Sequence, residues 1–575
     1  MADRDLVGRL AGAGVPPGAA VGIAVVAAGV AVSAEGWCWS VLDPDLDQVA
    51  HLERDLGPRW TWWSAAGVAP RLLARGIRPR RCWDLGAVHR MLHGGHRDDP
   101  AAVWAAAHGR PVPASVIAAE PTLLDPLVED SATPLTADGD LQPSWTAADW
   151  PDLAVDEQLA RAERWAALAC DVQAAQLATL RALPDTRLAP LAPHLAELTA
   201  RSESAAALLA VELEHDGLPV DLAATAELLG RLLGPRPGDL AEAAATRSRR
   251  DDEVLRHVPA DARCDLRNPA QVRTMLGRLG FDLPDTRSWR LEPFRDAHPA
   301  VAALLAWRKI QRVATTYGYG WVDRHVGADG RLRGEWGASD GGAGRMTASA
   351  GLHNLPVELR PVVAAEPGRV LVRADLGQVE QRLLAAVSHD RALVATTADD
   401  DLYLPVAAAL GVDRPTAKVW MLAAMYGQTS GTAAAVLLRM DAAYPDAMRY
   451  LRAAEQQGRT GGDVRTYGGR LVRGRPPGDN ALGRYLRNAV VQGAAAEMFK
   501  AWTAAVRAGL VGLDGQLVLC LHDELLLHVP EGAADPTVAL VRRALTETAG
   551  RWCAGLPVRF VADVSVVKRW SEAKS

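Results

Sequence analysis

Residues 369–390 read Arg-Val-Leu-Val-Arg-Ala-Asp-Leu-Gly-Gln-Val-Glu-Gln-Arg-Leu-Leu-Ala-Ala-Val-Ser-His-Asp, and this stretch decides the fold. Its apolar run at 370–372 predicts a short buried strand that stops at Asp375. From Gln378 onward the apolar residues recur at helical spacing, which predicts a helix with Glu380 near its start. Two carboxylates at such a junction can hold a metal ion, although a capped strand-to-helix turn would show the same pattern.

Length and composition describe a globular chain of several domains. At 575 residues it is too long for one core, and about 150 residues per domain predicts three or four domains or subdomains. The net charge is −6, so any nucleic acid must be bound by local basic grooves. Five of the 63 basic residues are lysines and the other 58 are arginines, which makes each lysine unusual.

The cysteines and one apolar segment indicate in which cellular compartment the chain folds and whether it enters a membrane. The six cysteines are far apart and form no Cys-x-x-Cys pair, which argues against a zinc site or a disulfide framework and fits a reducing compartment. Residues 19–34 are apolar but consist mostly of Ala, Gly and Val, and Gly29 divides them into two β-branched runs. We therefore expect two buried strands there and no membrane segment.

Periodicity divides the chain into three regions. Residues 1–183 alternate strand-like and helical runs and end in a long Ala/Leu helix, which predicts an α/β unit. Residues 184–330 are mostly helical, and residues 331–575 return to mixed α/β. The longest elements expected are helices at 155–183, 205–215, 222–233, 269–279, 298–317, 414–426 and 481–508, and a hairpin at 516–529.

A second informative stretch runs from Asp413 to Gly427. Arg414, Lys418, Leu422 and Tyr426 are four residues apart and form one stripe of the predicted helix. Two cations on the first turns of a helix suit a polyphosphate, because the helix dipole, the guanidinium and the ammonium favour the same anion. A solvated basic face is the alternative.

The predicted hairpin carries three consecutive ionisable residues at its bend. His522, Asp523 and Glu524 lie between two apolar strands, where buried charge is costly unless an opposite charge faces it. A divalent metal ion would provide that charge. The alternative is an ordinary polar turn, which usually contains Gly or Asn, and neither is present.

A fourth stretch predicts contact with a nucleic acid groove. Arg484, Asn488 and Gln492 share one helical face, and their long polar side chains can reach groove acceptors that every base pair presents. The same reasoning applies to Arg345 and Asn354 in loops upstream of the first stretch. An exposed polar helix face is the alternative.

Taken in order, these stretches resemble the motifs of family A DNA polymerases, the DNA polymerase I type. Residues 371–382 resemble motif A, residues 414–427 resemble motif B, and residues 521–524 resemble motif C. The similarity covers about 190 to 575. The residues that match are Asp375, Gln378, Glu380, Arg382, Arg414, Lys418, Tyr426, Gly427, His522, Asp523 and Glu524.

The resemblance implies a multidomain α/β and α+β fold. A ribonuclease-H-like domain of the 3′–5′ exonuclease type would occupy residues 1–183 and precede a right-hand polymerase domain. The helical thumb and its connection to the palm would occupy 184–330. The palm and fingers would occupy 331–575, with the motif B helix in the fingers.

The resemblance also implies a role for each site residue. Asp375, Asp523 and the backbone of Leu376 would hold two Mg²⁺ ions, and Glu524 and Lys418 would assist catalysis. The nucleotide would be bound by Arg414, Lys418, Tyr426, Glu380, Gln378 and Leu422. DNA would be bound by Arg345, Asn354, Arg382, Arg484, Asn488, Gln492 and His522.

Two kinds of departure from the family pattern qualify these expectations. Leu422 replaces an aromatic ring that stacks near the incoming sugar, and Leu376-Gly377 replaces Tyr-Ser, which puts nucleotide affinity and sugar discrimination in question. In the N-terminal region no Asp-x-Glu occurs before residue 160, and Trp165 and Ala169 take the places of the Tyr and Asp of the last exonuclease motif. We therefore expect an exonuclease-like fold without proofreading activity, and no 5′ nuclease domain.

These features together predict a template-directed DNA polymerase that extends a primer 3′-hydroxyl with deoxynucleoside triphosphates. We expect a monomer in the bacterial cytoplasm, associated with the nucleoid, whose partners are primer-template DNA and nucleotides. One alternative is a catalytically weak scaffold that binds primer-template on a polymerase fold. The other is a polymerase that retains 3′–5′ exonuclease activity.

Overall fold

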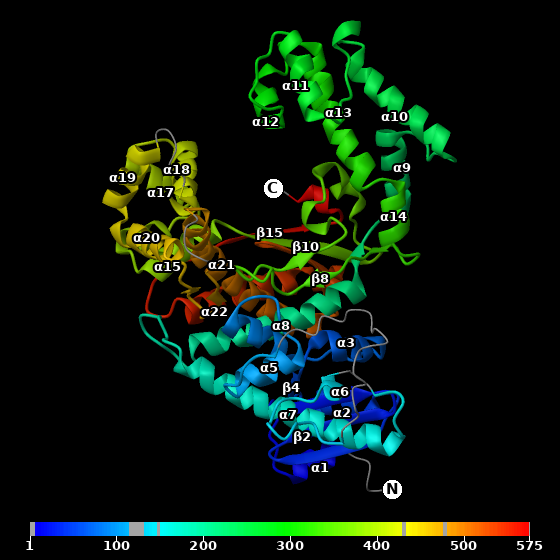
Figure 1. The fold of residues 1–575 in the computed structure, drawn as a ribbon, viewed down its shortest axis with the longest axis vertical. Helices are drawn as coiled ribbons and strands as arrows, with labels where there is room; N and C mark the ends of the chain where they lie inside the picture. Colours follow the sequence, from blue (N-terminus) through cyan, green and yellow to red (C-terminus); the bar gives the residue numbers. More distant parts are fainter. Residues whose placement is uncertain (1–5, 114–131, 147–149, 428–432, 475–479, 574–575) are drawn as a thin grey trace. The chain divides into compact units, whose positions relative to one another are not determined.

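A computed structural model describes residues 6–113, 132–146, 150–427, 433–474 and 480–573 (Figure 1). The chain forms two compact units, each assembled from separate segments. The first unit consists of residues 1–217, 335–348 and 367–567, and the second of residues 218–334, 349–366 and 568–575. No helix in the described ranges is long and apolar enough to cross a membrane.

The N-terminal part of the first unit is an α/β layer structure. Its described sheet has the order β3 (Trp37–Leu42), β2 (Gly29–Ala34), β1 (Ala20–Val26), β4 (Arg59–Trp62) and β5 (Arg81–Asp84). β1 pairs antiparallel with β2 and parallel with β4, and residues 21–26 and 29–34 are buried. The two buried strands expected at 19–34 are therefore confirmed.

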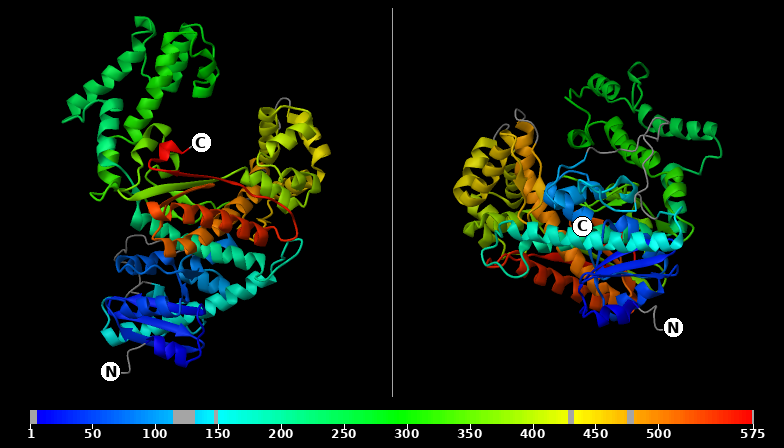
Figure 2. Two further views of the ribbon diagram at one scale, coloured as in Figure 1. Left: turned by 180° about the vertical axis from the view of Figure 1, so that it is seen from behind. Right: turned by 60° about the horizontal axis from the view of Figure 1, so that its bottom comes forward.

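Helices cover this sheet. The long helix α7 (Val155–Ala182) packs against β1, β2 and β3, as the two views in Figure 2 show. It confirms the helix expected at 155–183. The other described helices of this part are α1 (Leu6–Gly12), α2 (Asp47–Asp55), α3 (Ala65–Ala74), α4 (Leu85–His93), α5 (Pro100–Ala107) and α6 (Pro143–Thr146).

A second sheet of the first unit is built from strands far apart in sequence. Its described order is β13 (Gln516–Leu521), β14 (Glu524–Pro530), β10 (Arg369–Leu376) and β15 (Ala562–Val567), all antiparallel neighbours. The expected strand at 370–372 is longer than predicted, because β14 and β15 supply backbone partners as far as Leu376. The hairpin expected at 516–529 is confirmed by β13 and β14.

Helices complete the first unit around this sheet. The helix expected at 414–426 is α18 (Arg414–Tyr426), and the one expected at 481–508 is α21 (Asn480–Leu510). Asp413 caps α18 by accepting a hydrogen bond from the Thr416 amide, and Gly427 ends it with a φ of 65°. The others described here are α8 (Leu195–Asp216), α15 (Val379–Ser388), α16 (Arg391–Thr396), α17 (Tyr403–Leu410), α19 (Ala433–Ala443), α20 (Pro445–Arg459) and α22 (Ala534–Trp552).

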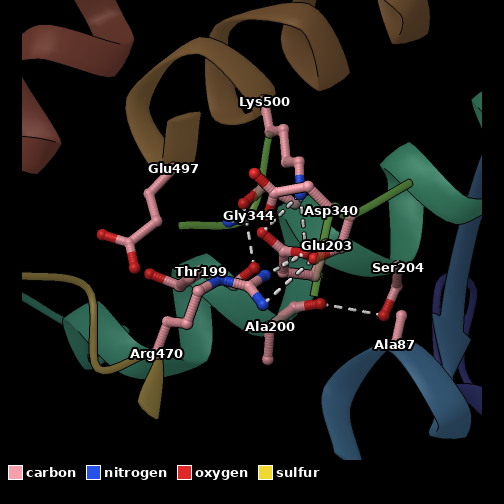
Figure 3. A network of polar contacts seen from close by, with 12 residues as sticks. Ala87, Thr199, Ala200, Glu203, Ser204, Asp340, Gly344, Arg470, Glu497 and Lys500 are labelled. Carbon is pink, nitrogen blue, oxygen red and sulfur yellow. Dashed lines mark hydrogen bonds and ion pairs between the residues drawn. The ribbon is translucent and has the colours of Figure 1, made fainter. Parts of the chain in front are cut away.

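A buried ionic network joins α8 to α21 and to the segment before β12 (Leu471–Val472) (Figure 3). Glu203 on α8 accepts hydrogen bonds from the Lys500 ammonium at 2.8 and 2.9 Å and pairs with Arg470 at 2.5 Å. The carboxylate of Glu497 accepts hydrogen bonds from the Thr466 hydroxyl and, at 2.8 Å, from the Gly468 amide. Because these groups are buried, each charge depends on its partners.

The second unit is mainly helical. Its described helices include α9 (Leu222–Leu233), α10 (Leu240–Leu255), α11 (Pro269–Arg278), α13 (Pro299–Thr316) and α14 (Tyr319–His325), with a small ladder of β6 (Leu218–Pro219) and β7 (Arg331–Leu332). The helices expected at 222–233, 269–279 and 298–317 are confirmed to within two residues. Of the predicted thumb, α8 belongs to the first unit because it packs against β5, α3, α4 and α21.

Candidate active site

The centre of the candidate site is a group of carboxylates at the end of β10. Asp375 lies opposite Glu524 on one neighbouring strand and opposite Asp563 on the other. The Leu376 amide donates a 3.0 Å hydrogen bond to the Asp523 carbonyl, which ties the hairpin turn to β10. The structure therefore brings Asp375 together with Asp523 and Glu524, which follow it by about 150 residues in sequence.

Burial makes ionisation of these carboxylates less favourable than in water. Burial, and after it the charge of Asp523, raises the pKa of Asp375 to about 6. Burial also raises the pKa of Asp523. Both shifts show that the ionised forms are unfavourable here, and a bound divalent cation would reverse this. Oxygen ligands of this kind are the ones that Mg²⁺ prefers, so the residues present fit the expected ions.

Arg373 is a functional residue that sequence reasoning missed. It is buried, and its guanidinium contacts Asp375 at 2.5 Å, Glu524 at 3.1 Å and Asp563 at 3.5 Å. Strand alternation could have revealed it, because Arg373 lies two residues before Asp375 and therefore on the same face of β10. In the described part of the chain, no group of three or more His, Cys, Asp or Glu side chains is arranged to hold a metal ion. In this structure the Arg373 guanidinium supplies positive charge to two of these carboxylates, Asp375 and Glu524.

A second cluster joins α15 to α18. The Arg345 guanidinium pairs with the Glu380 carboxylate at 2.6 Å, and the Tyr426 side chain lies close enough to lower the pKa of the same carboxylate. Burial raises the pKa of Glu380, while Arg345 opposes that shift. Glu380 and Tyr426, expected near the nucleotide, therefore lie together, and Arg345, expected on DNA, contacts the same carboxylate.

The stripe on α18 is arranged as the spacing predicts. Arg414 and Lys418 are exposed and Leu422 and Tyr426 are half-buried, so the stripe passes from solvent toward the interior. Arg414 pairs with Asp401 at 2.5 Å and lies over the Tyr403 ring. Lys418 has no ion pair within the described ranges. Its ammonium is available to an anion.

The expectation that Arg382 binds DNA is wrong. Its side chain is fully buried, and its guanidinium donates to the carbonyl oxygens of Gly377, Thr397, Asp399, Asp400 and Arg559 and to Gln378 Oε1. All its donors are engaged within the protein, so Arg382 holds the loops around α15 in place. The side chain of Gln378 is likewise engaged, by Arg382 and by the Leu402 amide.

The expected groove-binding row on α21 lies along one face, with Arg484 exposed and Asn488 and Gln492 half-buried. The Asn488 Oδ1 atom is buried without a hydrogen-bond partner among the described residues. Arg487, next to this row, donates to the Ala424 carbonyl and thereby fixes α21 against α18. An unsatisfied amide oxygen on this face is consistent with a polar ligand.

Two further expected DNA-binding residues lie elsewhere. His522 is exposed at the hairpin turn with a φ of 49°, and partial desolvation, followed by the charge of Arg345, lowers the pKa of its imidazole. A positive φ at a residue other than Gly costs energy and is common at functional sites. Asn354 belongs to the second unit, where its side chain is exposed and its carbonyl accepts hydrogen bonds from Arg312 and Tyr317 at 2.8 Å.

In the N-terminal α/β part, an aromatic and an apolar side chain stand at the two positions, 165 and 169, where the sequence predicts that the last exonuclease motif has lost its Tyr and Asp. The Trp165 ring stacks on Trp63 with centroids 4.3 Å apart, and Ala169 is buried one turn further along α7. The sequence of β1 contains no carboxylate. Asp84 is buried, but its oxygens cap α4 and accept from the Ala65 amide, which is a structural role.

Comparisons with known proteins agree with this geometry. Residues 258–572 match the family model described as DNA polymerase family A. DNA polymerase I of Deinococcus radiodurans is 28% identical over 374 residues, which are 56% of this chain and 38% of that protein. DNA polymerase I of Chloroflexus aurantiacus is 27% identical over 428 residues, or 66% of this chain and 44% of that protein. The chain thus spans less than half the length of these relatives.

A solved structure shows the same fold. It is the polymerase domain of Pol1 from M. smegmatis in complex with DNA primer-template and dNTP, and it superposes with a TM-score of 0.66 at 20% identity. The superposition covers 100% of this chain and 99% of that one. The predicted right-hand polymerase fold is therefore confirmed. Because the family model matches more than half of its residues, this chain belongs to DNA polymerase family A.

Proposed function

We propose that this chain is a template-directed DNA polymerase that adds deoxynucleotides to a primer 3′-hydroxyl. The observation that carries the proposal is the meeting of Asp375, Asp523 and Glu524 at one end of the sheet. The cationic stripe of Arg414 and Lys418 on α18 supports it. A carboxylate group that binds metal ions and a cationic face that binds phosphates are the two parts that phosphoryl transfer needs.

Asp375 and Asp523, with the Leu376 carbonyl, would hold two Mg²⁺ ions in this account, and Glu524 would assist beside them. When bound, such ions lower the pKa of the primer hydroxyl and neutralise charge on the leaving pyrophosphate. Burial and the neighbouring charge of Asp523 raise the pKa of Asp375 to about 6, which supports this assignment because a bound cation would offset both effects.

The nucleotide would be bound mainly by α18. Arg414 would exchange its contact with Asp401 for the triphosphate, and Lys418 would bind the same phosphates. Tyr426 would line the base-pair pocket, while Glu380, oriented by Arg345 and Tyr426, would exclude a ribose 2′-hydroxyl. Gln378 would act by positioning α15, and Leu422 would contact the sugar without the stacking of an aromatic ring.

The primer-template would lie along α21. Arg484, Asn488 and Gln492 would contact groove atoms, and His522 and Asn354 would hold the backbone. The unsatisfied Asn488 Oδ1 supports this assignment. DNA primer-template and dNTP are the ligands named for the related solved structure, which supports the same ligands here. The bacterial relatives support a place beside the nucleoid in the cytoplasm, and we propose that the protein acts as a monomer.

We further propose that the N-terminal α/β domain does not proofread. The stacked Trp165 and Trp63 rings and the side chain of Ala169 offer no metal ligand, and hydrolysis by two metal ions needs several carboxylates. The test is degradation of a 5′-labelled primer in Mg²⁺ without nucleotides. We expect the primer to stay intact with wild type, and 3′-end shortening that persists in Asp523→Asn would contradict the proposal.

The experiment that tests the polymerase proposal separates synthesis from binding. Extension of a labelled primer by wild type, its loss in Asp523→Asn, and unchanged primer-template binding by that variant are expected. Asp535→Asn is the matched control, because Asp535 is an exposed acid in the first turn of α22, outside the site. Binding without extension by folded wild type would favour the scaffold alternative.

A further inference from the structure

A cavity away from the candidate active site is lined by an unusual number of arginines. It has a volume of about 250 Å³ and lies in the first unit, where β4, β5, α8, α21 and α22 meet. Six of its sixteen lining residues are arginines, whereas arginine makes up only about a tenth of the chain. They are Arg59, Arg80, Arg81, Arg201, Arg507 and Arg551.

Few of these positive charges are balanced by carboxylates. Arg507 pairs with Glu212 at 2.6 Å, and Arg201 pairs with Glu197 at 2.5 Å. The other four form no ion pair with any residue that the structure describes. The Arg201 Nε atom is buried without a hydrogen-bond partner in the same described ranges.

Arg59 shows most clearly how these positive charges affect one another. Its guanidinium donates only one hydrogen bond that the structure resolves, to the Cys82 carbonyl at 3.3 Å. Burial, and after it the charge of Arg201, lowers the pKa of Arg59 to about 10. The lowered pKa means that the charged form of Arg59, although still present at neutral pH, is less favourable here than in water. An anion in the cavity would relieve the repulsion between these guanidinium groups.

We propose that this cavity is a binding site for the phosphate groups of a small anion, of the chemical class of inorganic pyrophosphate. Guanidinium groups fit phosphate because their planar forks donate paired hydrogen bonds to its oxygens. The arginines come from both parts of the first unit, Arg59 and Arg81 from the N-terminal sheet and Arg551 from α22. A bound anion would therefore neutralise both sides and stabilise the junction between them.

The test is calorimetric titration of inorganic pyrophosphate into the full chain, with EDTA present and in a Lys418→Ala background. EDTA and the Lys418→Ala substitution weaken the proposed nucleotide site, and the cavity variants are compared within that background, so the result does not depend on the polymerase assignment. Arg59→Gln and Arg551→Gln should each weaken binding at least about tenfold, the loss expected for one charge-assisted contact. Arg54→Gln, an exposed arginine on α2 outside the cavity, should change affinity less than twofold.

Loss of binding in these variants can be distinguished from loss of folding. Arg551 and Arg81 are exposed, so replacing either side chain opens no cavity in the core. Arg81→Gln replaces Arg59→Gln if the latter fails to fold. Equal affinity in wild type and in the folded cavity variants would overturn the proposal. A short single-stranded oligonucleotide that binds through these arginines while pyrophosphate does not would also overturn it, in favour of a nucleic acid contact.

Discussion

Replacing Arg373 with Met should strengthen the binding of divalent cations at Asp375. In the structure the Arg373 guanidinium lies 2.5 Å from Asp375 and 3.1 Å from Glu524, so it already supplies positive charge to both carboxylates. A metal ion on the same carboxylate would lie close to that charge and be repelled by it. Methionine fills a similar volume without the charge.

The size of the effect follows from Coulomb's law. Two cations that share one carboxylate are separated by roughly 6 Å, and a unit charge and a divalent ion at that distance in water repel by about 1.4 kcal/mol. This corresponds to about a tenfold change in affinity. The site is partly buried, where screening is weaker than in water, so tenfold is the smallest change expected.

The assay is titration with Mn²⁺ followed by electron paramagnetic resonance, without DNA or nucleotide. Arg369→Met is the matched control, because Arg369 begins the same strand but pairs with Asp514. Arg373→Met should also melt at a lower temperature in EDTA and recover with Mn²⁺, since the metal replaces the lost charge. Equal Mn²⁺ affinity in wild type and a folded Arg373→Met variant would refute the reasoning.

Four other predictions concern stability and nucleotide binding. Arg382→Gln should cost about 4 kcal/mol in urea unfolding, because buried carbonyl groups lose their donors, and a change below 1 kcal/mol would contradict its structural role. Glu203→Gln should cost about 3–5 kcal/mol, because it leaves Lys500 and Arg470 buried without their shared carboxylate partner. Burial raises the pKa of Glu497 from 4.5 to about 7. Between these two pH values the folded protein therefore keeps a proton on Glu497 that the unfolded chain releases. Stability should therefore fall as pH rises from about 4.5 to 7, and Glu497→Gln should flatten this slope in urea titrations. Lys418→Ala should raise the KM for deoxynucleotides at least about tenfold while primer-template affinity stays within twofold, and an unchanged KM would exclude Lys418 from the phosphate site.

Local signals explain which parts could be predicted from the sequence. The boundaries of α18 are set by Asp413 and Gly427, which act through contacts with their near neighbours, so the helix and its cationic stripe were predicted correctly. The three ionisable residues at 522–524 stood out because they interrupt two apolar strands. Their joining with Asp375 followed from the family resemblance and is confirmed by the sheet register.

Contacts between distant segments explain what could not be predicted. Arg382 and Arg373 look like ordinary surface or groove cations in sequence. Arg382 is buried only because loops at 397–400 and 559 fold over it, and Arg373 faces carboxylates on two other strands. Similarly, the pairing of Arg345 with Glu380 needs the register between a loop and α15. Glu380 lies more than 30 residues from Arg345 in sequence. Of the carboxylates that contact Arg373, Asp375 alone lies nearby in sequence.

The most direct test of the central claim is single-nucleotide extension of a defined primer-template in Mg²⁺ by wild type and Asp375→Asn. The account predicts that wild type adds only the deoxynucleotide complementary to the template base. It also predicts that Asp375→Asn, with its fold and primer-template affinity intact, loses at least about a thousandfold in rate. Equal extension by the two proteins, or addition independent of the template base, would contradict the account.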